Sequence, residues 1–179
     1  MQARGADGAR FGATDKPVFV LCDGIVCDGY IYKYLWDDLA AYGGVAHWNY
    51  RGHGRSASPV DVNRIHVIDH ARDLDAVRTH LGDPEVILVG HSFGTQVVLE
   101  AYRLRPERVR ALILISGSYG RITYTFKNSD VLATVLPNLL DFAARHPRFA
   151  RALWSRMPVS LGMSLARMTG DIDLRSVRP

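Results

Sequence analysis

The sequence predicts an α/β fold in which helices cover both faces of a parallel sheet, a three-layer α/β/α sandwich. Four runs of strand length are dominated by large apolar residues: Val18–Cys22, Val45–Tyr50, Val86–Val89 and Ala111–Ile115. Helical periodicity fills the three intervals between these runs, and a glycine-flanked turn directly follows the third run. Because helical crossovers between strands of one sheet are right-handed, the four strands are expected to be parallel.

Composition narrows the class of protein. A chain of 179 residues with 47% hydrophobic and 22% charged residues is typical of one soluble globular domain. The net charge of +4 comes from scattered arginines without interleaved aromatic residues, so nucleic-acid binding is not predicted. Cys22 and Cys27 have no histidine cluster nearby, which predicts free thiols, no metal site and a cytoplasmic protein. No apolar run approaches the roughly 20 residues of a membrane span, and none resembles a signal peptide.

The first elements follow from short local patterns. Residues 1–16 are rich in Gly, Ala, Asp and Arg, which predicts a mobile N-terminal segment with a remnant strand near Arg10–Ala13. The uninterrupted apolar run Val18–Cys22 is typical of a central strand that is buried on both faces. A helix is expected over Ile31–Ala41, ended by the glycine pair at 43–44. Its inward residues are expected to be Tyr34, Leu35 and Leu39.

The next two helices have clearer signals. The second is expected from Asn63 as its N-cap to Gly82 as its stop, with an apolar stripe that runs along it from Ile65 to Leu81. Its outer face carries charges that we expect to be solvated: Arg72, Asp73, Asp75 and Arg78. The third helix follows the glycine-flanked turn and is ended by Pro106.

Beyond Gly120 the pattern changes from strands to helices alone. The apolar residues predict three short amphipathic helices, broken by Pro137, Pro147 and Pro158. We interpret residues 121–179 as a helical lid on a core of residues 17–120, with ordinary core packing as an equal alternative for its apolar stripe. The segment from Arg145 to Arg167, both included, contains five arginines and no carboxylate. A solvated basic face explains them most simply, and contact with anionic lipid or an acidic partner is the alternative.

The glycine-flanked turn Gly90-His91-Ser92-Phe93-Gly94 is the candidate functional site. It joins an aliphatic strand to an amphipathic helix, the setting of a nucleophile elbow, which raises the serine hydroxyl above the edge of the sheet. Gly90 and Gly94 permit the close approach of strand and helix that this turn requires. A structural Gly-Ser turn is the alternative. The carboxyl ends of parallel strands share one rim, so Ser92 is expected in its middle, where ligands bind.

Several motifs in the same order resemble the α/β-hydrolase superfamily, in its branch with a helical cap after the sixth strand. Asp23-Gly24-Ile25 is similar to the family's His-Gly-x loop, and residues 49–56 are similar to its Asp-x-Arg-Gly-x-Gly-x-Ser turn. The resemblance implies that Ser92 attacks an acyl carbon while the backbone amides of Ile25 and Phe93 hold the oxyanion. It implies a small, largely apolar ester or related acyl compound as substrate, and no cofactor.

Two residues depart from the family's motifs. Asp23 stands where histidine is common, and Asn49 stands where aspartate is common. A carboxylate beside an oxyanion hole disfavours the anion, so catalysis requires Asp23 to be paired or turned away.

The histidine that serves the family as general base is the larger departure. The resemblance places an acid and then a histidine after the serine, and His146 is the only histidine after Ser92. His146 lies five residues after Asp141 and before Pro147, so a role at a helix C-terminus is favoured over that of base. His53 and His91 are explained locally as turn residues. Because the chain ends inside the apparent cap, we expect the N-terminal portion of a longer hydrolase or a naturally shortened homologue.

Two hypotheses follow from the sequence. The first is a serine hydrolase whose nucleophile and oxyanion hole lie in this chain without a visible base. The second is a non-catalytic binding or partner protein that retains the fold.

Overall fold

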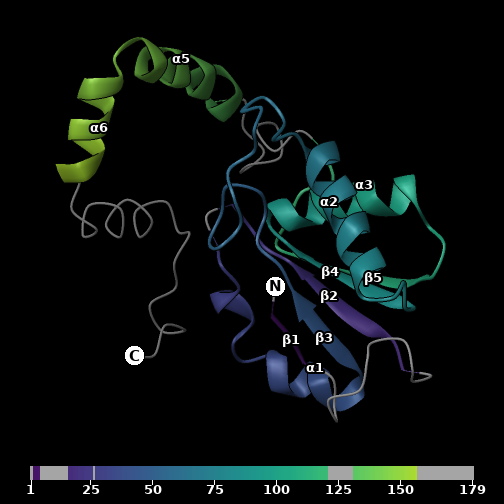
Figure 1. The fold of residues 1–179 in the computed structure, drawn as a ribbon. Coiled ribbons are helices and arrows are strands. Elements are labelled where there is room, and N and C mark those ends of the chain that lie inside the picture. Colours follow the sequence, from purple (N-terminus) through teal and green to yellow (C-terminus); the bar gives the residue numbers. More distant parts are fainter. Residues whose placement is uncertain (1, 5–15, 26, 121–130, 157–179) are drawn as a thin grey trace. The chain divides into compact units, whose positions relative to one another are not determined.

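The structure, a computed structural model, describes residues 2–4, 16–25, 27–120 and 131–156. The chain divides into two compact units, Met1–Thr125 and Phe126–Pro179, which are described separately. The first unit holds a sheet with the strand order β1-β3-β2-β4-β5 (Figure 1). Its strands are β1 (Gln2–Arg4), β2 (Val18–Cys22), β3 (Gly44–His47), β4 (Val86–His91) and β5 (Val109–Ile115).

The sheet confirms the predicted parallel arrangement. Strands β3, β2, β4 and β5 are parallel, and the short β1 pairs antiparallel with the outer edge of β3. The sequence did not indicate β1, because a three-residue strand depends on the edge that it pairs with rather than on its own pattern. The remnant strand expected near Arg10–Ala13 lies outside the described residues.

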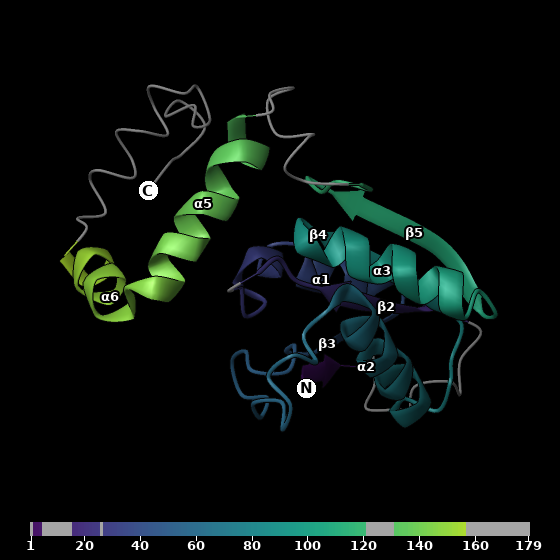
Figure 2. The same ribbon diagram turned by 90° about the horizontal axis from the view of Figure 1, so that it is seen from above.

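Helices cover both faces of the sheet and confirm the three-layer prediction. They are η1 (Tyr30–Tyr32), α1 (Trp36–Tyr42), α2 (Val67–His80) and α3 (Phe93–Leu104). Alternation along β2 divides the core: Val18 and Val20 pack in the cluster with α2 and α3, whereas Phe19 and Leu21 pack in the cluster with η1 and α1. Figures 1 and 2 show α2 and α3 side by side on their face of the sheet.

The expected helix over Ile31–Ala41 is split into η1 and α1, and two of its inward residues are wrong. Tyr34 is 78% exposed and Leu35 is also exposed, while Leu39 is half-buried. The buried residue is Tyr32, whose hydroxyl donates to the Cys22 carbonyl at 2.7 Å. That partner lies on another element, so the helical periodicity alone did not indicate which tyrosine is buried.

Helix α2 begins at Val67, three residues later than expected, and its N-cap is His66 rather than Asn63. The Asp69 side chain accepts hydrogen bonds from the His66 backbone N–H at 3.2 Å and from Arg64 Nε at 2.7 Å. A capping box therefore starts the helix, with His66 in the place of the usual serine or threonine.

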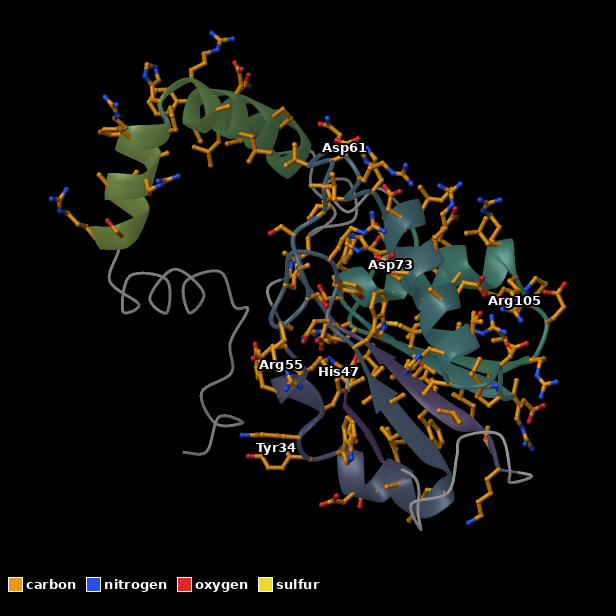
Figure 3. All side chains as sticks on the ribbon, in the orientation of Figure 1. Tyr34, His47, Arg55, Asp61, Asp73 and Arg105 are labelled. Carbon is orange, nitrogen blue, oxygen red and sulfur yellow. The ribbon has the colours of Figure 1, made fainter. Side chains whose placement is uncertain are left out.

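The expectation that all the charges of α2 are solvated is wrong for Arg78. Its side chain is 1% exposed and donates to the carbonyls of Arg105 at 3.1 Å and Glu107 at 2.6 Å. Asp73 forms a two-pronged ion pair with Arg51, and Asp75 pairs with Arg105 at 2.7 Å; Figure 3 labels Asp73 and Arg105. The charged face of α2 thus connects the helix to the loop after β3 and to the α3–β5 connection.

The second unit contains α5 (Val131–Arg145) and α6 (Pro147–Arg156). Pro137 lies inside α5 and does not break it, so that expected break is wrong: a proline removes one backbone hydrogen bond, and the rest of the 15-residue helix continues. Pro147 is the first residue of α6, where its missing N–H has no consequence. Pro158 and the third expected helix lie outside the described residues. No helix in the described part of the chain is long and apolar enough to cross a bilayer.

Candidate active site

Ser92 connects the end of β4 to the start of α3 in a strained backbone conformation. Its φ is 52° and its ψ is −116°, which is rare for a residue other than glycine. Three hydrogen bonds hold this turn: Ser92 N–H to the Ile115 carbonyl at 2.9 Å, Thr95 N–H to the Ser92 carbonyl at 3.1 Å, and Thr95 Oγ1 to the Gly90 carbonyl at 3.2 Å. The result is an exposed serine at the carboxyl end of a central strand.

The two glycines of the turn are required by close backbone contacts. A Cβ atom at Gly90 would lie 2.5 Å from the Gly94 carbonyl oxygen. A Cβ atom at Gly94 would overlap the carbonyl oxygens of Cys22 and Asp23. Strand β2, the turn and α3 therefore meet here without room for a side chain.

The loop after β2 lies directly beside the turn. A Cβ atom at Gly24 would be 3.2 Å from Ser92 Cβ and 3.2 Å from His91 Nδ1. Neither the Ile25 N–H nor the Phe93 N–H donates a hydrogen bond to any residue that the structure describes. The two amides named from the sequence thus have no acceptor among the described residues, and the Ile25 side chain is 59% exposed.

Asp23 is paired, as the sequence analysis required. Its Oδ2 lies 2.7 Å from His47 Nε2, and both side chains are buried. The Tyr50 hydroxyl donates to the Asp23 carbonyl at 2.9 Å. The sequence analysis missed His47, which Figure 3 labels on β3. Its signal was available as a polar residue inside an apolar strand, since such residues are buried with a partner.

A second buried histidine, His70, packs against the residue that follows Ser92. His70 of α2 is 3% exposed, and its ring centre lies 4.8 Å from that of Tyr50 and 5.5 Å from that of Phe93. Burial lowers the pKa of His70. His53 also packs edge-on against Tyr50, and its Nδ1 lies 3.2 Å from the Arg51 carbonyl oxygen. His53 and His70 are therefore explained by packing and local contacts.

Burial also sets the protonation of groups near the turn. It raises the pKa of Tyr32 and that of Tyr50, so both hydroxyls remain hydrogen-bond donors. It raises the pKa of the Cys22 thiol to about 12. Cys22 and Cys27 are free, and the described residues contain no cluster of three or more side chains suited to hold a metal ion.

No histidine among the described residues of the first unit hydrogen-bonds to the Ser92 hydroxyl. His91 has a buried Nδ1 without a partner in this part of the chain. His146 lies in the second unit directly after α5, with its ring centre 4.8 Å from that of Phe142 and its N–H donating to the Phe142 carbonyl at 3.0 Å. These local contacts agree with the role expected for His146 at a helix C-terminus.

The pKa of His70 leads to a pH-dependent stability. Since burial disfavours its imidazolium form, the folded-state pKa lies below the unfolded value of about 6.5. As the pH falls, the unfolded chain binds a proton at His70 before the folded chain does. The contribution of neutral His70 to the free energy of unfolding is therefore fully present above the unfolded pKa, and it is lost as the pH falls through the folded pKa. We expect His70→Phe to reduce the drop in urea midpoint between about pH 7.5 and about pH 5.5. His80→Phe, at an exposed site on the same helix, should leave the drop unchanged, and an unchanged drop in His70→Phe would contradict the assignment.

Comparisons with known proteins agree with this geometry. A family model described as alpha/beta hydrolase fold matches residues 17–171. A proline iminopeptidase of Saccharolobus solfataricus is 31% identical over 56% of this chain and 33% of its own length. The lipase LipV of Mycobacterium tuberculosis is 27% identical over 82% of this chain and 54% of its own length.

Solved structures show the same fold. One, from a study of carboxylesterases of Nitrososphaera gargenis, superposes with a TM-score of 0.58 at 22% identity, over 74% of this chain and 51% of that chain. The chain thus spans between one third and somewhat more than one half of the length of these relatives. From the strand order, the strained serine turn and the family match, the chain belongs to the α/β-hydrolase fold family.

Proposed function

We propose that the chain carries the nucleophile and the oxyanion-binding amides of a serine hydrolase that cleaves an ester or related acyl bond. The observation that carries the proposal is the strained backbone conformation of Ser92, an exposed residue at the carboxyl rim of the sheet. Strain at a residue other than glycine persists where the surrounding structure enforces it, and it concentrates at functional sites. Three hydrogen bonds and the glycine contacts enforce it here.

In the proposed reaction, Ser92 Oγ bonds to the acyl carbon while its proton passes to a base. The carbonyl electron pair moves to oxygen, and the Ile25 and Phe93 amides bind the resulting oxyanion. One such donor contributes about 2.7–4 kcal/mol to the transition state in acyl transfer. Collapse of the intermediate expels the alcohol or other leaving group, which takes the proton from the base, and leaves the acyl group on Ser92 Oγ. Water then attacks this ester, gives its proton to the base and releases the acid, and Ser92 Oγ takes the proton back. His146 is the candidate base within this chain, and no step requires a cofactor.

Apolar side chains on the loops that follow the strands support an apolar substrate. Ile25 follows β2 and is 59% exposed, and Tyr119 follows β5 and is 90% exposed. Val60 and Val62, in the loop between β3 and α2, are also exposed. The helices α5 and α6 carry exposed apolar residues too, in keeping with a lid: Leu139, Leu140, Phe142, Phe149 and Leu153. Such surface favours an acyl or alcohol group that is itself apolar.

The test is labelling of the whole chain by a fluorophosphonate probe, followed by peptide mass mapping. We expect one adduct at Ser92 that is absent from Ser92→Ala. Ser155→Ala is the matched control, because it removes an exposed serine hydroxyl from α6 and should leave labelling at the wild-type rate. His146→Ala tests the candidate base: a base contributes about 10²–10⁴-fold, so a smaller loss would exclude His146 from this role.

The alternative is a non-catalytic protein that retains the fold and binds a small molecule or a partner. It is favoured by the lack of a histidine hydrogen bond to Ser92 among the described residues of the first unit. A folded chain that shows no fluorophosphonate adduct at Ser92 would contradict the hydrolase proposal and support this alternative.

A further inference from the structure

We propose that the buried pair of Asp23 and His47 positions the loop from Asp23 to Gly29, and with it the Ile25 amide, beside Ser92. The effect of this pair on catalysis rests on the proposed function, whereas its hold on the loop does not. We call residues 23–25 and 27–29 the oxyanion loop below.

The pair is well placed to resist displacement. Asp23 follows the last residue of β2, His47 ends β3, and the two strands are parallel neighbours in the sheet. Asp23 Oδ2 and His47 Nε2 are 2.7 Å apart, and the side chains are 2% and 6% exposed. Asp23 Oδ1 is buried and has no partner among the described residues. Because a buried carboxylate is costly without a partner, the side chain depends on His47.

His47 also contacts the far end of the oxyanion loop. Gly29 packs so closely on its ring that a Cβ atom there would lie 2.9 Å from His47 Cε1 and 3.1 Å from Nδ1. Gly29 has a φ of +90°, a left-handed conformation that favours glycine. One imidazole therefore bonds to the first residue of the loop and packs against its last residue.

These contacts favour a positioning role for His47 over that of general base. Its Nε2 is engaged by Asp23. Gly29 packs on the Cε1 side of the ring, where a Cβ atom would lie equally close to the two ring nitrogens. An aspartate and a histidine in contact resemble the acid and base of a serine hydrolase, but no hydrogen bond joins His47 to the Ser92 hydroxyl among the described residues. His47 is a positioning residue.

The main chain transmits the position of Asp23 to the site. The Tyr50 hydroxyl donates to the Asp23 carbonyl at 2.9 Å, and the Tyr32 hydroxyl donates to the Cys22 carbonyl at 2.7 Å. The next residue, Gly24, packs against Ser92, and Ile25 follows it. A shift of Asp23 would therefore move the Ile25 amide relative to Ser92. Misplacement by about 1 Å can cost roughly a hundredfold in rate.

Cys27 provides a readout of the loop that does not require any reaction at Ser92. It lies inside the oxyanion loop and is half-buried, whereas Cys22 is fully buried and serves as an internal control. We expect Asp23→Ala to speed alkylation of Cys27 by iodoacetamide at least about threefold, because a loop that opens locally exposes its thiol more often. Peptide mass mapping assigns the modified cysteine.

Three further variants make the test specific. Asp23→Asn retains an oxygen that accepts a hydrogen bond from His47, so we expect its alkylation rate to return close to that of the wild type. His47→Phe keeps a ring against Gly29 but removes the nitrogen that contacts Asp23, so it should resemble Asp23→Ala. Leu81→Ala removes a buried side chain at the end of α2 and controls for general loss of stability. Far-UV circular dichroism and thermal melting establish that each variant is folded.

Fluorophosphonate labelling of Ser92 is then compared across the same set. In Asp23→Ala we expect the maximal labelling rate to fall roughly 10- to 100-fold, with little change in the probe concentration that gives half of this rate. Asp23→Asn should recover most of the rate. Leu81→Ala should not show this pattern, because a purely structural defect does not act on the transition state alone.

The outcomes distinguish the two proposals. If alkylation of Cys27 speeds up in Asp23→Ala and Ser92 labelling falls, the positioning role is supported in full. If alkylation speeds up while no protein, including the wild type, labels at Ser92, the hold on the loop stands and the proposed hydrolase fails. Unchanged alkylation in folded Asp23→Ala and His47→Phe would overturn the inference. Faster alkylation with undiminished Ser92 labelling would overturn its catalytic part.

Discussion

Gly94→Ala is expected to lower the free energy of unfolding by about 3 kcal/mol or more, because the added methyl group overlaps two backbone carbonyls. The carbonyls of Cys22 and Asp23 are held in place by the hydroxyls of Tyr32 and Tyr50. Neither carbonyl can move away without breaking a buried hydrogen bond. The methyl group would therefore force β2 and the start of α3 apart.

Urea unfolding followed by far-UV circular dichroism measures this loss. Gly120→Ala is the matched control, because a Cβ atom there meets nothing within 4 Å, and it should leave stability within about 0.5 kcal/mol of the wild type. A Gly94→Ala protein as stable as Gly120→Ala would contradict the close approach of β2 and α3. Loss of Ser92 labelling in a folded Gly94→Ala protein would add that the same contact positions the nucleophile.

Arg78→Met should destabilise the first unit by about 2–3 kcal/mol, because it leaves two carbonyls without their donor. Methionine is unbranched and fills much of the space of the arginine stem, so the variant mainly removes the guanidinium. That group donates to the carbonyls of Arg105 and Glu107 in the α3–β5 connection. Burial lowers the pKa of Arg78, which shows that the charge itself is held against a desolvation cost.

The control for Arg78 lies on the same helix. Arg72 is exposed. Arg72→Met should therefore change the free energy of unfolding, measured by urea, by less than about 0.5 kcal/mol. We expect Arg78→Lys to fall between the two, since one ammonium group cannot reproduce the fork of a guanidinium. Equal stability of Arg78→Met and the wild type would show that the buried hydrogen bonds have no net value.

The strands and the serine turn were predictable because their signals are local. Large aliphatic runs such as Val18–Cys22 indicate buried parallel strands whatever surrounds them. The strand, turn and helix around Ser92 follow from glycine spacing and helical periodicity within about 20 residues. The order of these elements was then sufficient for a parallel sheet, with all the turns that follow the strands on one rim.

Contacts between distant elements were not predictable in the same way. The periodicity of α2 placed Arg78 among solvated charges, because the carbonyls that it serves lie 27 and 29 residues later in the chain. His47 and Asp23 are 24 residues apart and look unrelated in the sequence. The apolar run that surrounds His47 indicates that this residue is buried, but it does not indicate its partner.

The fold class, the strand direction and the place of the serine turn therefore follow from the sequence, because these depend on hydrophobic pattern and turn chemistry within single elements. The identity of the buried polar groups and of their hydrogen-bond partners is visible only in the three-dimensional structure. A buried polar group needs a partner, and this partner can come from any element that the fold brings into contact. The pairing of Asp23 with His47, which bears on the oxyanion loop, belongs to this second kind.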